Sequence, residues 1–328
     1  MKSNVLFITA VLSVCSANTI ERSKYFPSER FIYFPDDDNG DLHLVDLEEA
    51  VDEAAILEYT RNPDSNSYWL YTRANPIEEQ VLIFEDEESV KASNFNKDKE
   101  VVVIVHGWGG KGKNTMSLML TEAFLIADDC NIIVLDWSAL ANRNYVTARY
   151  GVPAVGKSLG QFIQWLTSVG ASYNRMHLVG FSLGGHLIGN AGQEVNGLIR
   201  RLTALDPAGP LWGSSSDKIS DTDGMYVEVM HTNTGLYGYT DPCGDVDFYP
   251  NGGTNMPGCW RSSCSHSKAY EYMAATVKYD HLFGNMCETL RDATSDVCEG
   301  HLIPMGNRDM KKNGSGIFRV NTESAYPF

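Results

Sequence analysis

The stretch "MHLVGFSLGGHLIGN", residues 176–190, joins an apolar run to a segment with helical spacing. The first seven residues are typical of a buried strand. Gly180 and Gly184 flank Ser182 and predict a sharp, strained turn in which larger side chains would clash with the neighbouring strand or helix. The stretch therefore predicts a strand, a tight turn with Ser182 at its apex, and a helix.

The chain on either side repeats this alternation of apolar strands and helical patterns. Such alternation is typical of an α/β fold with a mainly parallel sheet and helices on both faces. The expected strands are "VVVIVHGW" (101–108), "NIIVLDW" (131–137), "MHLVGFS" (176–182) and "RLTALD" (201–206), and the expected helices cover 153–170, with Pro153 in the first turn, and 184–196.

The sequence G-x-S-x-G between a strand and a helix is the pattern of a nucleophile elbow. The alternative is a glycine-rich turn with an incidental serine. A serine hydroxyl becomes a nucleophile only when a base removes its proton, and the acid that orients the base follows the serine in folds of this kind. Asp206 ends the next expected strand, in "LDPAGP", and is the candidate acid. It could instead be an ordinary turn residue before Pro207.

Two histidines compete for the role of the base. His231 ends the apolar run "YVEVMH", and His266 precedes the helical pattern "SKAYEYMAATV", so we place it in a loop. Spacing favours His266 only modestly, so both remain candidates at this point. We interpret His43, His106, His177 and His186 as structural, while His281 and His301 flank the later cysteines.

A tetrahedral intermediate also needs donors for its oxyanion. One candidate is the backbone N–H of Leu183, directly after the serine. The other is the N–H of Trp108 in "HGWGG" (106–110), where the glycines allow close backbone approach. The alternative for this second segment is an ordinary turn at the end of a strand.

Residues 1–17 have the pattern of a secretory signal peptide, with Lys2, a short apolar run and small residues before a cleavage point after Ala17. The apolar run is half as long as a membrane-spanning helix, which needs about 20 residues. We therefore expect a secreted protein. The net charge of -16 argues against a nucleic-acid partner. Of the seven cysteines, six remain after cleavage, which suggests three disulfides.

The segment from Asp36 to Glu53 holds nine acidic residues and no Lys or Arg. Such a block is usually a solvated segment. We interpret residues 18–58 as an exposed N-terminal extension or a propeptide, and both alternatives stay open. Residues 59–328 are long enough for a single catalytic α/β domain.

Seven short motifs follow one another along the chain in the order found in the pancreatic lipase family of the α/β-hydrolases, which the sequence therefore resembles. The resemblance implies that Ser182 is the nucleophile, Asp206 the acid and His266, rather than His231, the base. It implies that Trp108 and Leu183 are the oxyanion donors. The motifs are "VIVHGW", "VLDW", "HLVGFSLGGH", "LDPAGP", "DFYPNGG", "PGC" and "CSH".

The departures from the family pattern concern domains and metals. The resemblance ends near Phe328, so we expect no C-terminal β-sandwich and no partner of the colipase type. In calcium-binding members an acid-rich loop precedes the strand that ends in "HT". Here Asp223 remains, but Ser215 and Ser220 replace acidic ligands, so we expect no calcium and no other cofactor.

The resemblance also implies cysteine pairs. Cys259 and Cys264 match the disulfide of the family's lid, and Cys287 and Cys298 match a later local loop. Cys130 and Cys243 remain and are paired only by exclusion. A zinc site at Cys259, Cys264 and His266 is the alternative for the lid stretch, but C-x4-C-x-H is an unusual frame, and secretion favours oxidation.

The lid is the main indication of the substrate. Only residues 260–263 separate its cysteines, as in the family's phospholipases A1 and the neutral lipases of insects. Four residues cannot cover an acyl-binding cleft, so we expect an open site that cleaves the sn-1 ester of phospholipids or galactolipids at a micelle or membrane surface. The alternatives are a triacylglycerol lipase and a non-catalytic lipid-binding or storage relative.

Overall fold

The computed structural model describes residues 30–62 and 65–328. The predicted signal peptide, residues 1–17, lies outside the described residues. No helix in the described part of the chain has both the length and the apolar character that crossing a membrane requires.

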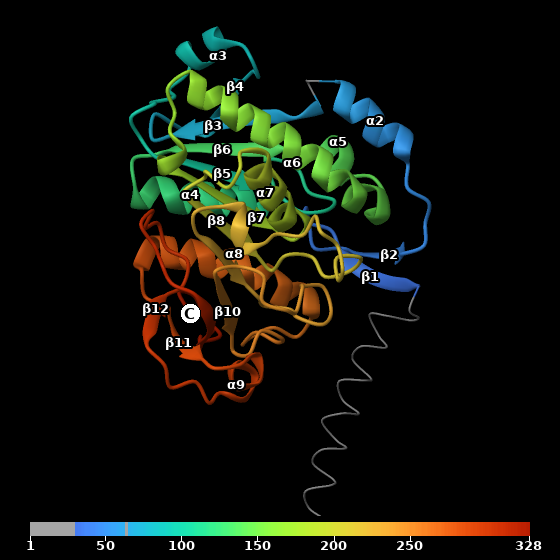
Figure 1. Cartoon of the computed structure of the whole chain (residues 1–328), viewed down its shortest axis with the longest axis vertical. Helices are drawn as coiled ribbons and strands as arrows, with labels where there is room; N and C mark the ends of the chain where they lie inside the picture. Colours follow the sequence, from blue (N-terminus) through green and yellow to red (C-terminus); the bar gives the residue numbers. More distant parts are fainter. Residues whose placement is uncertain (1–29, 63–64) are drawn as a thin grey trace, which may run out of the picture.

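The main sheet has eleven strands, and its central strands are parallel (Figure 1). The order across the sheet is β12-β11-β13-β10-β9-β8-β7-β5-β6-β3-β4. The run from β13 to β6 is parallel throughout, and antiparallel strands close both edges. This confirms the expected mainly parallel sheet and its four predicted strands. The bounds are β3 Ser67–Thr72, β4 Asn75–Leu82, β5 Val101–Val105, β6 Asn131–Asp136, β7 Met176–Phe181, β8 Arg201–Leu205, β9 Val227–Met230, β10 Val246–Pro250, β11 Phe283–Cys287, β12 Leu302–Pro304 and β13 Gly316–Val320.

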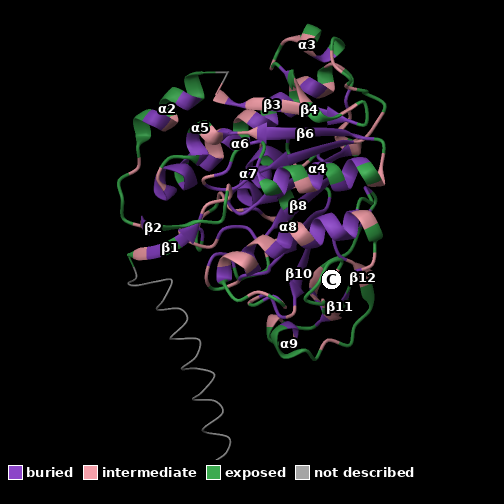
Figure 2. Cartoon of the chain, turned by 180° about the vertical axis from the view of Figure 1, so that it is seen from behind, coloured by how far each residue is buried: buried purple, intermediate pink, exposed green. Residues whose placement is uncertain are grey.

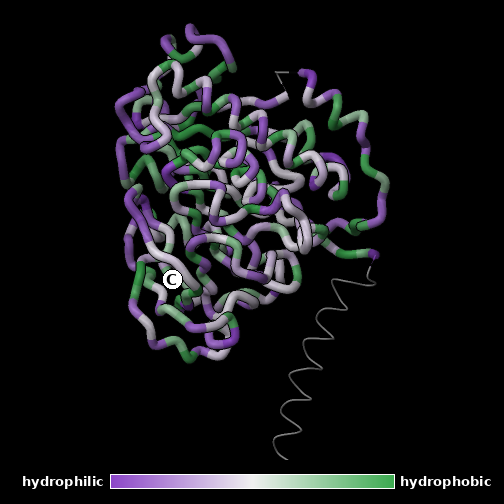
Figure 3. Tube along the Cα trace, in the orientation of Figure 1, coloured by the Kyte–Doolittle hydropathy of each residue, from purple (hydrophilic) through white to green (hydrophobic). Residues whose placement is uncertain are grey.

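Helices cover both faces of the sheet. Because side chains alternate along each strand, every central strand contributes residues to two cores. In β5, Val103 joins the core beneath α6 and α7, and Ile104 joins the core beneath α4 and α8. Figure 2 shows the strands buried between the helices, and Figure 3 shows the same strands as the apolar centre of the chain. The helices are α2 Glu53–Arg61, α3 Glu87–Lys91, α4 Thr115–Ala127, α5 Ser138–Ala141, α6 Tyr145–Ser168, α7 Leu183–Glu194, α8 Ser262–Tyr279 and α9 Leu290–Ser295, with short 3-10 turns at Tyr173–Arg175 and Asp221–Asp223.

Helix α6 begins before the predicted position. The prediction placed Pro153 in the first turn, but α6 begins after Asn144, whose side chain caps it, and Pro153 lies inside the helix. Proline removes one backbone hydrogen bond there. Ala148 and Val152, before the proline, are fully buried in the core. Burial of this helix face therefore outweighs the missing hydrogen bond.

The acidic N-terminal segment folds as part of the domain. Strands β1 (Phe31–Pro35) and β2 (Leu42–Asp46) form an antiparallel hairpin. Ile32, Phe34 and Val45 are at most 5% exposed and join the same core as α6 and α7. The interpretation as an exposed extension is therefore wrong for this hairpin. The alternative, removal of residues 18–58 as a propeptide, stays a prediction.

Two of the three expected disulfides are confirmed. Cys259 pairs with Cys264, with Cα atoms 5.5 Å apart, and Cys287 pairs with Cys298, with Cα atoms 4.5 Å apart. Both bridges join residues close in the chain.

The pairing of Cys130 with Cys243 is wrong, because both are free thiols. Cys130 directly precedes β6 and Cys243 lies shortly before β10, and four strands separate β6 from β10. With neighbouring strands about 4.8 Å apart, the two positions are on the order of 24 Å apart. A disulfide joins Cα atoms separated by only about 4.4–6.8 Å.

Candidate active site

Ser182 lies at the sharp turn between β7 and α7. Its backbone has φ 55° and ψ -119°, a conformation that L-residues rarely adopt. A Cβ on Gly180 would lie 2.1 Å from the carbonyl oxygen of Gly184, and a Cβ on Gly184 would lie 2.5 Å from that of Val105. The two glycines of the motif are therefore required by close backbone contacts, as the sequence predicts.

Asp206 directly follows β8 and is completely buried. Its Oδ1 accepts hydrogen bonds from the backbone N–H groups of Thr232, at 2.7 Å, and Asn233, at 3.0 Å. Its Oδ2 lies 2.5 Å from Nδ1 of His266. The carboxylate is thus held by the loop after β9 on one side and by the imidazole on the other.

His266 lies in the first turns of α8. We expected a loop there, but α8 begins at Ser262 and includes the second half of the lid stretch. The His266 ring centroid lies 4.5 Å from that of Phe181 and 6.0 Å from that of Phe34. These apolar contacts and the Asp206 hydrogen bond set the orientation of the imidazole.

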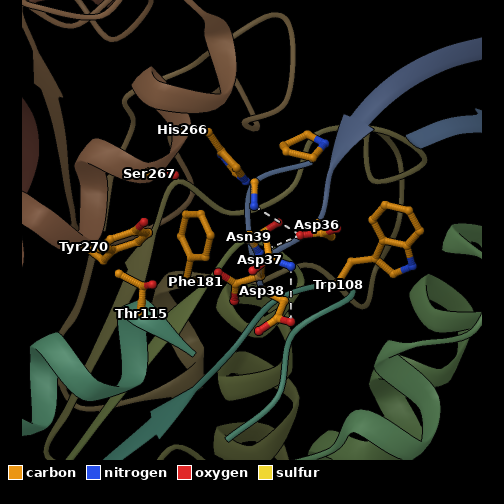
Figure 4. Close-up of a pocket in the computed structure, with 13 residues that line it drawn as sticks. Asp36, Asp37, Asp38, Asn39, Trp108, Thr115, Phe181, His266, Ser267 and Tyr270 are labelled. Carbon is orange, nitrogen blue, oxygen red and sulfur yellow. Dashed lines mark hydrogen bonds between the residues drawn. The ribbon is translucent and has the colours of Figure 1, made fainter. Parts of the chain in front are cut away.

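Ser182 and His266 line the same pocket, which has a volume of about 260 Å³ (Figure 4). Ser182 Oγ and His266 Nε2 are both buried, and neither has a hydrogen-bond partner among the described residues. Catalytic hydrogen bonds are often long before substrate binds. The structure therefore brings Ser182, His266 and Asp206 together in the order that general-base activation of a serine requires.

His231 is bonded to other groups. Its Nε2 lies 2.9 Å from Asp247 Oδ1, and its Nδ1 lies 2.9 Å from the carbonyl oxygen of Tyr239. His231, Cys243 and Asp247 form the one group among residues 30–62 and 65–328 whose ligand atoms are close enough for a metal ion. Because both ring nitrogens are occupied, His231 does not pair with Asp206. Four further histidines bond elsewhere, namely His43 to Asp36, His177 to Thr203, His186 to Ala208 and His281 to Pro327.

The two predicted oxyanion donors flank the serine. Trp108 lines the pocket with Ser182, and its backbone N–H makes no hydrogen bond among the described residues. Leu183 is the first residue of α7, where an N–H has no acceptor within the helix. The positive end of the helix dipole lies at the same position. Both N–H groups are therefore available to an anion beside Ser182 Oγ.

The turn of the N-terminal hairpin also lines this pocket, and the sequence interpretation missed it. Residues 35–40 contribute to the pocket wall, and Figure 4 shows Asp36, Asp37 and Asp38 at its centre. Burial raises the pKa of Asp37 to about 6, and a hydrogen bond from the Gly107 N–H opposes this rise. A signal for the hairpin was present, because "FIYF" and "LHLV" flank a turn rich in Asp, Asn and Gly.

The residues considered for metals have other partners. Cys259 and Cys264 form a disulfide, so their sulfurs are not free thiolates for zinc. The Asp223 carboxylate accepts hydrogen bonds from the Ser220 N–H, at 2.8 Å, and from the Gln193 side chain, at 3.0 Å. Asp223 therefore caps its own 3-10 turn, Asp221–Asp223, and connects this turn to Gln193 of α7.

Comparison with known proteins agrees with this geometry. A family model described as Lipase matches residues 47–293. Lipase member H of Oryctolagus cuniculus is 33% identical over 251 residues, which are 72% of this chain and 54% of the relative. Pancreatic lipase-related protein 2 of Mus musculus is 30% identical over 260 residues, which are 70% of this chain and 54% of the relative. The chain thus spans about half the length of these relatives. Since the family model covers more than half of the chain, the protein belongs to the lipase family of α/β-hydrolases.

Proposed function

We propose that the protein is a serine-dependent carboxylic ester hydrolase that acts on lipids. The observation that carries the proposal is the 2.5 Å contact between Asp206 and His266, with the free Nε2 of that histidine in the pocket of Ser182. Active-site labelling distinguishes this enzyme from a lipid-binding relative without activity.

In the proposed mechanism, His266 Nε2 removes the proton of Ser182 as Oγ attacks the ester carbonyl. Asp206 stabilises the imidazolium through Nδ1 and keeps the ring in the required tautomer. The N–H groups of Trp108 and Leu183 donate to the developing oxyanion, and each such donor typically contributes about 3 kcal/mol to transition-state stabilisation. His266 then protonates the leaving alcohol. Water, activated by the same histidine, hydrolyses the acyl-enzyme and restores Ser182.

For the substrate, we propose sn-1 cleavage of phospholipids or galactolipids. The lid between Cys259 and Cys264 has four residues, and two of them already belong to α8. The pocket is also lined by Asp36, Asp38 and Asn39. A short lid and a polar pocket wall suit single amphiphiles with hydrated head groups better than an apolar oil phase.

A triacylglycerol lipase is the second candidate. Trp260, in the lid, is 96% exposed. An exposed Trp suits contact with a lipid interface. Among the relatives, the pancreatic triacylglycerol lipase of Sus scrofa is 29% identical over 312 residues, which are 83% of this chain and 69% of the relative. In both cases we propose that the enzyme is secreted, acts at a micelle or membrane surface and needs no partner of the colipase type.

Labelling with a fluorescent organophosphonate tests the proposed chemistry. The purified protein should label stoichiometrically and hydrolyse a soluble short-chain ester, and Ser182→Ala should lose both properties. Ser168→Ala, an exposed serine at the end of α6, is the matched control and should behave like the wild type. A folded wild-type protein that neither labels nor hydrolyses the ester would refute the proposal.

A substrate panel separates the two candidate substrates. Phosphatidylcholine, monogalactosyl diacylglycerol and triolein are compared under identical detergent conditions in a pH-stat. We expect the two polar lipids to be hydrolysed at least tenfold faster than triolein. The reverse order would favour the triacylglycerol lipase.

A further inference from the structure

The N-terminal hairpin holds the backbone on both sides of Trp108. The Gly107 N–H donates to Asp37 Oδ2 at 2.6 Å, and the Asp37 N–H donates to the Trp108 carbonyl oxygen at 2.8 Å. The peptide group between Gly107 and Trp108 lies between these two contacts. Its N–H is the proposed oxyanion donor. Asp37 therefore restrains the donor peptide from both ends.

A third contact restrains the same peptide through its carbonyl oxygen. The Gly107 carbonyl oxygen lies 3.0 Å from Nδ1 of the buried His106. Since C=O and N–H point in opposite directions across a trans peptide, this contact directs the Trp108 N–H away from His106. The N–H that remains without a partner among the described residues is thus held in one orientation.

The hairpin itself is anchored by burial and by further contacts with this loop. The Phe34 ring lies 6.0 Å from those of Trp108 and His266. The Asn114 side chain donates to the Asp37 carbonyl oxygen at 3.0 Å, and Lys111 pairs with Asp38 at 2.8 Å. The acidic turn therefore has a defined position relative to the serine and the histidine.

We propose that Asp37 is a positioning residue of the oxyanion hole, and that the turn of the hairpin, residues 35–40, is a permanent wall of the active site. The inference rests on the proposed ester hydrolase function. It requires that the mature enzyme retain the hairpin, so a propeptide would have to end before it.

The opposite possibility is that the acidic turn blocks the site until it is removed. The contacts favour positioning, because Asp37 binds the N–H of Gly107 and leaves those of Trp108 and Leu183 without a partner from the hairpin. An inhibitory carboxylate would occupy the donors that the oxyanion uses.

Kinetics of Asp37 variants in the full chain test the proposal, with a soluble short-chain ester as substrate. Asp37→Ala should lower kcat at least tenfold with KM changed less than threefold, because the lost restraint affects the oxyanion more than the bound ester. Affinity for a boronic acid transition-state analogue should fall by a similar factor. Asp37→Asn keeps an oxygen acceptor for Gly107 and should stay within threefold of the wild type.

The matched control is Asp46→Ala, which removes an acid of the same hairpin that pairs with the exposed Arg30. It should leave kcat unchanged. The positioning role would be overturned if Asp37→Ala kept its kcat, if it became more active, or if Asp37→Asn fell as far as Asp37→Ala. An inactive wild type would instead refute the proposed function, so the two failures are distinguishable.

Discussion

Oδ2 of Asp206 and Nδ1 of His266 lie 2.5 Å apart, although 60 positions separate the two residues in the chain. The other carboxylate oxygen accepts two backbone N–H groups, from Thr232 and Asn233. The carboxylate is therefore held in place by donors that do not take part in the proposed reaction. This arrangement leads to two predictions about the acid.

Asp206→Asn should lower kcat about 10³- to 10⁴-fold while the protein stays folded. The two backbone N–H groups require an acceptor, so the amide oxygen of the new side chain should face Thr232 and Asn233. Its NH2 group would then face Nδ1 of His266 and favour the wrong tautomer. Burst and steady-state kinetics with the soluble ester, together with thermal unfolding, provide the measurement. A loss below tenfold in kcat would contradict the assigned role of Asp206.

Gly238→Ala should displace the acid. An added Cβ would lie 2.4 Å from Oδ1 and 2.7 Å from Cγ of Asp206, so the carboxylate or the loop must shift. A misplacement of about 1 Å can cost a hundredfold in rate, and we expect at least a tenfold loss in kcat. Gly213→Ala, where a Cβ would meet no atom within 4 Å, is the control and should keep full activity. Equal activities of the two variants would show that the contact is harmless.

The free cysteines predict a thiol count. Protein that lacks residues 1–17, denatured without a reductant, should react with a chromogenic disulfide reagent at two thiol equivalents, from Cys130 and Cys243. In the native protein both should react slowly, because burial raises the pKa of each thiol, that of Cys130 to about 12. A count of zero would show that Cys130 and Cys243 are oxidised and would contradict their assignment as free thiols.

The protein should become less stable as the pH is lowered, because it buries a neutral histidine. His186 is fully buried against Trp212, donates to the Ala208 carbonyl oxygen and accepts from the Ile219 N–H. Burial lowers its pKa from 6.5 to about 3. Between these values the unfolded chain binds the proton and the folded chain does not, so the free energy of unfolding falls as pH falls. The contribution is about 1.4 kcal/mol for each pH unit.

Urea unfolding between pH 4 and 6.5 measures this slope. In His186→Gln, the number of protons taken up on unfolding should fall by close to one, whatever the effect of the substitution on stability at neutral pH. The exposed His301, changed to Gln, is the control and should keep the wild-type slope. An unchanged slope in His186→Gln would mean that this imidazole does not stay neutral in the folded protein.

The predictable parts of the site are those encoded in short contiguous stretches. The elbow requires glycines two positions before and after Ser182, and each local disulfide joins cysteines at most eleven positions apart. The acidic hairpin was not predicted, because its many acidic residues indicated a solvated segment. Its alternating apolar residues, which indicate strands, were the weaker signal in the sequence. Each fully buried side chain such as Ile32 or Phe34 contributes about 1.5–3 kcal/mol. Repulsion between acids that stay in water is weaker, so the apolar pattern prevails.

By itself, the sequence determined the alternation of strands and helices, the turn at Ser182 and the order of serine, acid and histidine, because these follow from local backbone and side-chain chemistry. Only the tertiary structure decided which distant groups meet. The order of the strands separates Cys130 from Cys243. Strand β10 places Asp247 beside His231, and Asp206 pairs with His266 instead. Packing of the hairpin core also places Asp37 beside Gly107. Such contacts depend on how whole elements pack, which no short stretch of the chain specifies.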